Sequence, residues 1–109
     1  MTVSFELDGQ PFLALNGGPQ FTFSEAISFQ VSCETQDEVD WFWTKLSEGG
    51  EEGPCAWLKD RFGLSWQIVP TALPRLLSDP DREKSQRVMA AMLQMKKIEI
   101  DVLEQAAAA

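Results

Sequence analysis

The stretch AISFQVSCETQDEVDWFWTKL, residues 26–46, decides the fold, because it contains two different hydrophobic periods in succession. In its first part every second residue is apolar, at Ile27, Phe29 and Val31. This period of two is typical of a strand with one buried face, and the small polar residues between predict a polar second face. In its second part the apolar residues recur at helical spacing, at Val39, Phe42, Trp43 and Leu46. The stretch therefore predicts a strand followed by a helix that packs against a sheet.

Residues at either end of the apolar stripe predict the limits of this helix. Thr35 and Glu38 form a capping box, in which hydroxyl and carboxylate each accept a free backbone N–H at the helix start. Gly49-Gly50 ends the helix, and Glu51-Glu52 are expected to be solvated residues of the glycine-rich loop that follows. Trp41 lies off the stripe, and two interpretations stay open: packing at the helix edge, or exposure at an interface.

A β-hairpin is predicted before this stretch. Val3, Phe5 and Leu7 alternate with polar residues, so we expect one face of a first strand to be buried. Asp8-Gly9 supplies a tight turn, and residues 12–15 return as a second strand. The glycines of the following loop, residues 16–19, are not a phosphate cradle, because an extended segment and not a helix comes after them.

Two further strands are predicted beyond the helix, at residues 55–58 and 65–69, with Gly63 in the turn between them. The polar residues of the last strand, Ser65 and Gln67, share one face, whereas Trp66 shares the opposite face with Ile68 and is expected to pack in the core.

The C-terminal part of the chain is predicted to be helical after an interruption at Pro70 and Pro74. Asp79-Pro80 predicts a helix start. Its apolar stripe contains flexible core methionines: Val88, Met89, Met92 and Leu93. Residues 97–100 are expected to be short and extended, with Asp101 capping a final turn before a frayed alanine tail.

Composition limits the class of protein. The 109 residues suffice for one small domain, and the net charge of −8 disfavours nucleic acid and anionic lipid as partners. No apolar run approaches the roughly 20 residues that span a bilayer, so we expect no membrane partner and a cytoplasmic protein. Cys33 and Cys55 are expected to be reduced thiols. The absence of histidine excludes nucleophiles that imidazole activates.

The chain resembles PhnB-like members of the glyoxalase/bleomycin-resistance (vicinal oxygen chelate) superfamily. Residues 12–19, 26–31, 57–70 and 92–97 are similar to that subgroup. The resemblance implies an α+β fold in which βαβββ modules form a curved, mostly antiparallel sheet with flanking helices. Within one domain, residues 1–20 would be the remnant hairpin of an incomplete first module. Residues 21–70 would be the second βαβ-type module, and residues 71–109 a C-terminal helical extension.

The resemblance also implies partners. Family members ordinarily begin with a further strand, helix and strand, so this chain is expected to be a fragment, a late-start reading frame, or a form completed by a partner chain. An incomplete cup would leave an unpaired edge and uncovered apolar surface. We therefore expect a homodimer.

The resemblance aligns two positions of this chain with metal ligands of the superfamily. Ala26 occupies the usual position of a first-strand histidine and Gln67 that of a last-strand glutamate. A methyl group and a carboxamide bind divalent ions poorly, so we expect neither metal nor cofactor. PhnB-like sequences are frequently labelled 3-demethylubiquinone-9 3-methyltransferase. No glycine-rich turn or acidic ribose partner for S-adenosylmethionine is visible in this sequence, so methyl transfer is not expected.

These observations predict a metal-free cup that binds a small organic molecule through five residues: Ser28, Gln30, Trp57, Ser65 and Gln67. Three alternatives stay open. The polar residues could be the solvated face of the sheet. The chain could be a metal-dependent isomerase or dioxygenase, with Glu25 or Glu51 as unexpected ligands beside Gln67. It could also be a non-catalytic dimerisation module.

Overall fold

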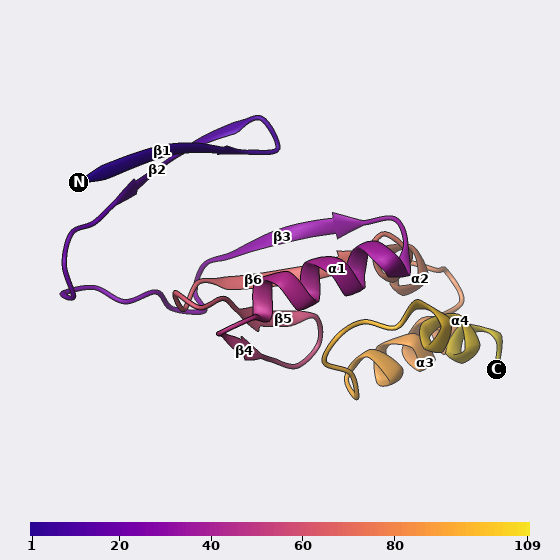
Figure 1. Ribbon diagram of the computed structural model, residues 1–109. Coiled ribbons are helices and arrows are strands. Elements are labelled where there is room, and N and C mark those ends of the chain that lie inside the picture. The colour runs from indigo at the N-terminus through magenta and orange to yellow at the C-terminus, as the bar shows by residue number, and fades with distance from the viewer.

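A computed structural model describes residues 1–109 as three parts that follow one another along the chain (Figure 1). The first is a hairpin of β1 (Thr2–Leu7) and β2 (Gln10–Leu15). The second is a four-stranded sheet covered by one helix, and the third is a group of three C-terminal helices. The molecule is elongated, with principal extents of 54 × 26 × 23 Å.

The sheet has the strand order β3-β6-β5-β4. Its strands are β3 (Ser28–Cys33), β4 (Glu51–Glu52), β5 (Trp57–Lys59) and β6 (Ser65–Pro70). β3 and β6 are parallel, whereas the β5–β6 and β4–β5 pairs are antiparallel. The connection from β3 contains α1 (Gln36–Ser47), so residues 28–70 form one βαβββ module. The expected α+β class is confirmed.

α1 packs on one face of this sheet and buries a core of five residues: Cys33, Val39, Trp43, Leu58 and Ile68. Trp66 packs against this core, as its register with Ile68 predicts. The Thr35 hydroxyl accepts the Glu38 N–H at 3.2 Å, which confirms the predicted cap. The Glu38 carboxylate accepts the N–H of Glu34, one residue earlier than the usual capping box.

The C-terminal helices are α2 (Ala72–Leu77), α3 (Arg82–Met92) and α4 (Ile100–Ala108). They pack around a second core, and Ala56 joins it from the segment before β5: Ala56, Leu73, Leu76, Val88, Met95, Ile98, Leu103 and Ala107. None of the helices has the length and apolar character that a bilayer crossing requires.

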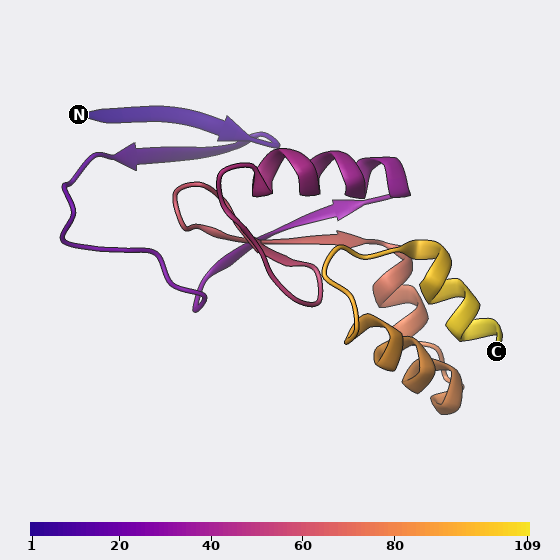
Figure 2. The same cartoon turned by 60° about the horizontal axis from the view of Figure 1, so that its bottom comes forward.

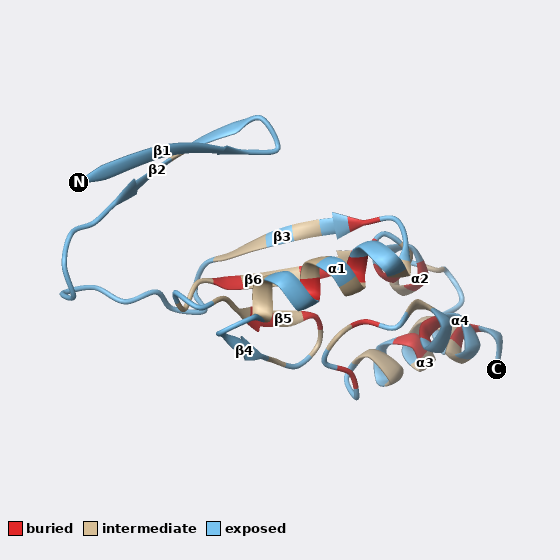
Figure 3. Cartoon of the chain, in the orientation of Figure 1, coloured by how far each residue is buried: buried red, intermediate tan, exposed pale blue.

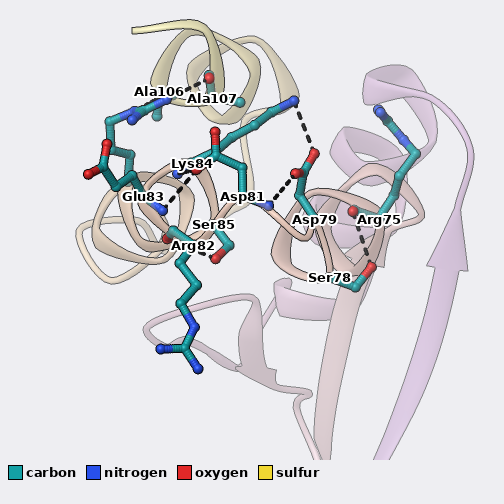
Figure 4. A network of polar contacts seen from close by, with 11 residues as sticks. Arg75, Ser78, Asp79, Asp81, Arg82, Glu83, Lys84, Ser85, Ala106 and Ala107 are labelled. Atoms are coloured by element: carbon teal, nitrogen blue, oxygen red, sulfur yellow. Dashed lines mark hydrogen bonds and ion pairs between the residues drawn. The ribbon is translucent and has the colours of Figure 1, made fainter.

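The predicted boundaries of these helices were partly wrong. Pro74 does not prevent α2, because it is the third residue of the helix, where its missing N–H has no intrahelical partner in any case. The cap of α3 is Asp81 and not Asp79, which instead lies in the turn after α2 and pairs with Lys84 of α3 at 3.1 Å (Figure 4). The alanine tail does not fray but forms the end of α4, where Arg87 donates to the carbonyls of Ala106 and Ala107.

The β1–β2 hairpin forms as predicted, but the expectation that one of its faces is buried was wrong. Asp8 and Gly9 adopt the positive φ values, 50° and 77°, of a tight hairpin turn. Val3, Phe5 and Leu7 are 53%, 42% and 40% exposed, because the rest of the chain covers this face only in part (Figure 3). Residues 16–27 connect the hairpin to β3 without forming a helix or a strand (Figure 2).

One line of aromatic rings joins this hairpin to the sheet. Phe5 stacks on Phe12 with ring centroids 5.5 Å apart. Phe12 meets Phe29 edge-on at 5.5 Å, and Phe29 meets Trp66 in the same way at 5.4 Å. Such contacts are worth about 1 kcal/mol each, which is little to orient two whole strands.

The strands around the second half of the sheet also differ from the prediction. Glu51 and Glu52 form the short strand β4, although the sequence predicted a loop there. β5 begins at Trp57 and not at Cys55, because Cys55 and Ala56 have positive φ values of 55° and 78°, which no strand residue adopts. The turn at Gly63, with φ of 85°, is as predicted.

Candidate functional site

The face of the sheet opposite α1, which we call the open face, contains all five residues that the sequence predicted for ligand binding. Strand register places Glu51, Lys59, Ser65 and Ser28 in one row across the four strands. The next row contains Trp57, Gln67 and Gln30. Alternation along each strand puts both rows on the same side, and α1 covers the other side.

A cleft of about 480 Å³ lies over one half of the open face. Trp57 and Ser65 line it, together with the ionisable residues Glu25, Glu51, Glu52 and Lys59. The turn at Gly53 and Pro54 contributes to its wall. Ser28, Gln30 and Gln67 lie on the same face but do not line this cleft, so the structure separates the five predicted residues into two groups.

The hydroxyl of Ser65 is the most unusual polar group of the cleft. Ser65 is 1% exposed, and its Oγ is the one buried side-chain oxygen or nitrogen of the chain without a hydrogen-bond partner. A buried polar atom left in this state costs about 1–3 kcal/mol, so nearly all such atoms in proteins find a partner. Ser65 lines the cleft, so its Oγ is a hydrogen-bonding group there that no other group of the chain satisfies.

The other three predicted residues bind one another or solvent. Gln67 Nε2 donates a hydrogen bond to Ser28 Oγ at 2.9 Å, across the β3–β6 pair. Gln30 is exposed beside them. This group forms a polar border next to the cleft.

One lysine and three glutamates carry the charge of the cleft. Lys59 forms an ion pair with Glu25, which lies in the segment before β3. The hydrogen bond from Lys59 lowers the pKa of the Glu25 carboxyl, and the same contact raises the pKa of Lys59. The charge of Glu51 also raises the pKa of Lys59, in agreement with their pairing across β4 and β5. Glu52 differs, because its carboxylate accepts the indole N–H of Trp43 at 2.7 Å on the α1 side.

The segment that leads into β5 holds the edge of the cleft in a strained conformation. Cys55 and Ala56 both have positive φ values, which are uncommon outside glycine and cost on the order of 1–3 kcal/mol each. Their N–H groups donate to the carbonyls of Met95 and Lys96 at 2.8 and 2.9 Å. These two hydrogen bonds to the C-terminal part of the chain thereby fix the backbone direction at Trp57, the residue that follows the bend.

The side chains of the open face do not fit a divalent metal ion. No three His, Cys, Asp or Glu side chains of the chain converge on a common point, as a metal site requires. Gln67 offers one neutral oxygen, and Glu51 is separated from it by β5. Ala26, expected in the strand, lies in the turn before β3. Glu25 is held by Lys59.

The sequence reasoning missed most of the wall of the cleft. Glu51 and Glu52 were interpreted as solvated loop residues, and Lys59 as part of a turn. The signal that could have found Lys59 is the alternation along residues 57–59, in which Trp57 and Lys59 share one face of the strand and Leu58 has the other. It was missed because the strand was predicted at residues 55–58, whereas β5 begins at Trp57 and includes Lys59.

Comparisons with known proteins relate the chain to one family. A family model described as 3-demethylubiquinone-9 3-methyltransferase matches residues 1–69, which leaves out α2, α3 and α4. A structure of a PhnB protein from Bacillus cereus is 32% identical with a TM-score of 0.58, over 65% of this chain and 64% of that one. A crystal structure of a protein from Pseudomonas aeruginosa, 17% identical, has a TM-score of 0.52 over 64% and 62% of the two chains and shows a similar fold.

The chain thus spans less than two thirds of the length of either solved relative. No curated protein matches its sequence.

Proposed function

The chain is a PhnB-like member of the 3-demethylubiquinone-9 3-methyltransferase family, and from this premise we propose that it binds a small organic molecule in the cleft of the open face. The observation that supports this proposal is the Ser65 hydroxyl, buried at the wall of the cleft without a partner. A volume of about 480 Å³ is within the range of small-molecule sites. A ligand polar group that pairs with Ser65 Oγ removes the cost of leaving it unpaired.

The strained bend at Cys55 and Ala56 supports the same site. Uncommon backbone conformations persist only where the surrounding structure holds them, and they cluster at ligand sites. This bend directly precedes Trp57, the largest side chain of the cleft wall. Trp57 offers a flat apolar surface, and the neighbouring Ser65 offers hydrogen-bond specificity.

Methyl transfer, which the family description names, is not part of the proposal. Binding of S-adenosylmethionine normally uses a glycine-rich turn between a strand and the N-terminus of a helix. Two strands of this chain lead directly into helices, β3 into α1 and β6 into α2. The junctions are Glu34-Thr35 and Thr71, without a glycine.

A ligand screen that reads both stability and location tests the proposal. Small organic molecules are screened by thermal shift, because a ligand that binds only the folded state raises the melting temperature. The compounds that stabilise the protein are then titrated while ¹H–¹⁵N spectra record the indole N–H signals of all tryptophans. We expect the Trp57 signal to shift.

Two tryptophan variants make the test specific. Trp57→Ala is expected to abolish the stabilisation, whereas Trp41→Ala, on the exposed side of α1, is the matched control and should retain it. The proposal is wrong if no compound stabilises the protein, or if the stabilising compounds act equally on the Trp57→Ala variant.

We also propose that the protein forms a homodimer through the β1–β2 hairpin. Two-stranded hairpins are at best marginally stable alone, and this one exposes apolar residues on both faces, with Leu13 at 65% and Leu15 at 72%. β3 is an edge strand of six residues, the same length as each hairpin strand. A second copy of the chain therefore offers a strand edge of matching length to which the hairpin can add.

A further inference from the structure

We infer that the ligand of the cleft is an organic cation, in which an ammonium group is joined to a flat apolar body. The inference rests on the proposed function and adds the chemical class of the ligand. It depends on three features of the cleft wall: the charge balance of its ionisable residues, the surface of Trp57, and the unpaired hydroxyl of Ser65.

The charge balance leaves one carboxylate of the cleft available. Lys59 is the single cation among the lining residues, and its ammonium group is bound to Glu25. Glu52 is engaged by the Trp43 indole on the α1 side. Glu51 forms no ion pair and no side-chain hydrogen bond, and lies beside the Lys59–Glu25 pair in the same row of the sheet. The cleft therefore has a net negative charge that its own lysine does not neutralise.

Trp57 lies within reach of this carboxylate. The N–H of Gly53 donates to the carbonyl of Trp57 at 2.9 Å, so Trp57 is paired with the position two residues after Glu51. Diagonal neighbours across antiparallel strands are about 7–8 Å apart, a separation that one small molecule spans. The face of an indole ring attracts ammonium groups and apolar rings alike. A cation bound to Glu51 can thus place its apolar body on Trp57.

Ser65 distinguishes this ligand from a simple inorganic cation. Its unpaired Oγ accepts a hydrogen bond from an N–H group, which a protonated amine supplies. Anionic ligands are disfavoured, because they would have to displace Glu25 from Lys59 against the charge of Glu51 and a protein of net charge −8.

Three probes of the same size and different charge test the inference: benzylammonium, benzyl alcohol and benzoate. Each is titrated at low ionic strength, and its dissociation constant is read from the Trp57 indole signal. We expect benzylammonium to bind most tightly and benzoate most weakly. The preference should shrink as salt rises to about 0.5 M, because exposed charges are then screened.

Two variants of the cleft should change the preference in opposite directions. Glu51→Gln is expected to lower the affinity for benzylammonium about fivefold and to leave the affinity for benzyl alcohol unchanged. This factor corresponds to the energy of a unit charge pair about 4 Å apart in water. Lys59→Met removes the competing ammonium group and is expected to strengthen benzylammonium by a similar factor. A gain of affinity is not an effect of misfolding. Glu6→Gln, on the distant hairpin, is the matched control and should change nothing.

The outcomes separate this inference from the proposed function. If benzyl alcohol and benzoate shift Trp57 as strongly as benzylammonium, the cleft binds ligands and the charge class is wrong. If Glu51→Gln leaves the affinity for benzylammonium unchanged, the inference is equally overturned. If none of the three probes binds at Trp57, the inference fails, and the broader screen decides the proposed function.

Discussion

At the scale of single residues, Gly50 shows how closely the end of β5 approaches the loop after α1. A Cβ at this position would lie far inside contact distance of the Lys59 carbonyl oxygen and 2.7 Å from the carbonyl carbon of Asp60. Both are backbone atoms that cannot turn aside as a side chain does. The glycine is therefore required by packing, and its φ is not positive.

We predict that Gly50→Ala lowers the free energy of unfolding by about 3 kcal/mol, as overpacking against backbone does. Gly17→Ala is the matched control, because the nearest atoms to its Cβ are 3.8 Å away. The control should stay within about 0.5 kcal/mol of the parent protein. Urea unfolding of both variants measures the difference, and equal stabilities would show that the loop can move.

Ser65 allows stability and binding to be separated at one residue. We predict that Ser65→Ala raises the free energy of unfolding by up to about 1 kcal/mol, because it removes a buried hydroxyl without a partner. Ser28→Ala should lower it by about the same amount, because Ser28 accepts a hydrogen bond from Gln67. Thermal and urea unfolding test the pair. A loss of stability in Ser65→Ala equal to that of Ser28→Ala would mean that the Ser65 hydroxyl is already paired.

At the scale of elements, the starts of α3 and α4 are stabilised in different ways. Asp81 accepts the N–H groups of Glu83 and Lys84 at the start of α3. Glu99 occupies the same position of α4 and caps nothing, because Gln36 of α1 accepts the N–H of Ile100 at 2.7 Å instead. Asp81→Ala should therefore cost about 1 kcal/mol of stability, and Glu99→Ala only a few tenths. Chemical unfolding followed by far-ultraviolet circular dichroism compares the two, and equal losses would contradict the prediction.

Three ion pairs, each between a helix or strand and a connecting segment, predict how stability depends on pH. The pKa of Glu25 is lowered by Lys59 and that of Asp40 by Lys97, while that of Asp79 is lowered first by the N–H of Asp81 and then by Lys84. Because the folded pKa values lie below the ordinary 4.5 and 3.8, the unfolded chain takes up protons first as the pH falls. This contribution to stability is fully present above those values and is lost as the pH falls through the lower folded ones.

We therefore expect constant stability from neutral pH to about pH 5 and a decline below it. Unfolding by urea between pH 7 and pH 3 measures the decline. Asp40→Asn should make the free energy of unfolding fall less steeply with decreasing pH. An unchanged slope in this variant would show that the Lys97–Asp40 pair does not contribute to the pH dependence.

The elements also show which parts of the structure the sequence could predict. Hydrophobic period was enough to identify three strands and one helix. The period of two marks the strands at Val3–Leu7, Ile27–Val31 and Ser65–Val69, and the helical stripe marks the helix from Val39 to Leu46. β4 was missed because two residues have no period, and α2 because Pro74 is a helix breaker everywhere except in the first turn. The shared open face followed from alternation, whereas the cleft depends on β4 and on the bend at Cys55 and Ala56.

At the scale of the whole molecule, the exposed hairpin predicts self-association. We expect sedimentation velocity at micromolar concentration to report a dimer. Leu13→Asp places a charge on the exposed face of β2 and should yield a monomer. Phe62→Asp, in the exposed turn between β5 and β6, is the control and should remain dimeric. A well-folded monomer of the parent protein under these conditions would exclude the dimer.

The order of strands in the sheet also has a consequence for synthesis. β3 pairs in parallel with β6, the last strand to be made, and Ser28 is paired with Ser65 although 36 residues lie between them in the chain. During synthesis β3 and α1 can reach their native packing only after residue 70 has emerged from the ribosome, because β6 completes the surface that buries Val39. The hairpin, whose contacts are local, can close earlier. A nascent chain that is halted in β5 should therefore be cleaved readily by proteases at residues after the β1–β2 hairpin.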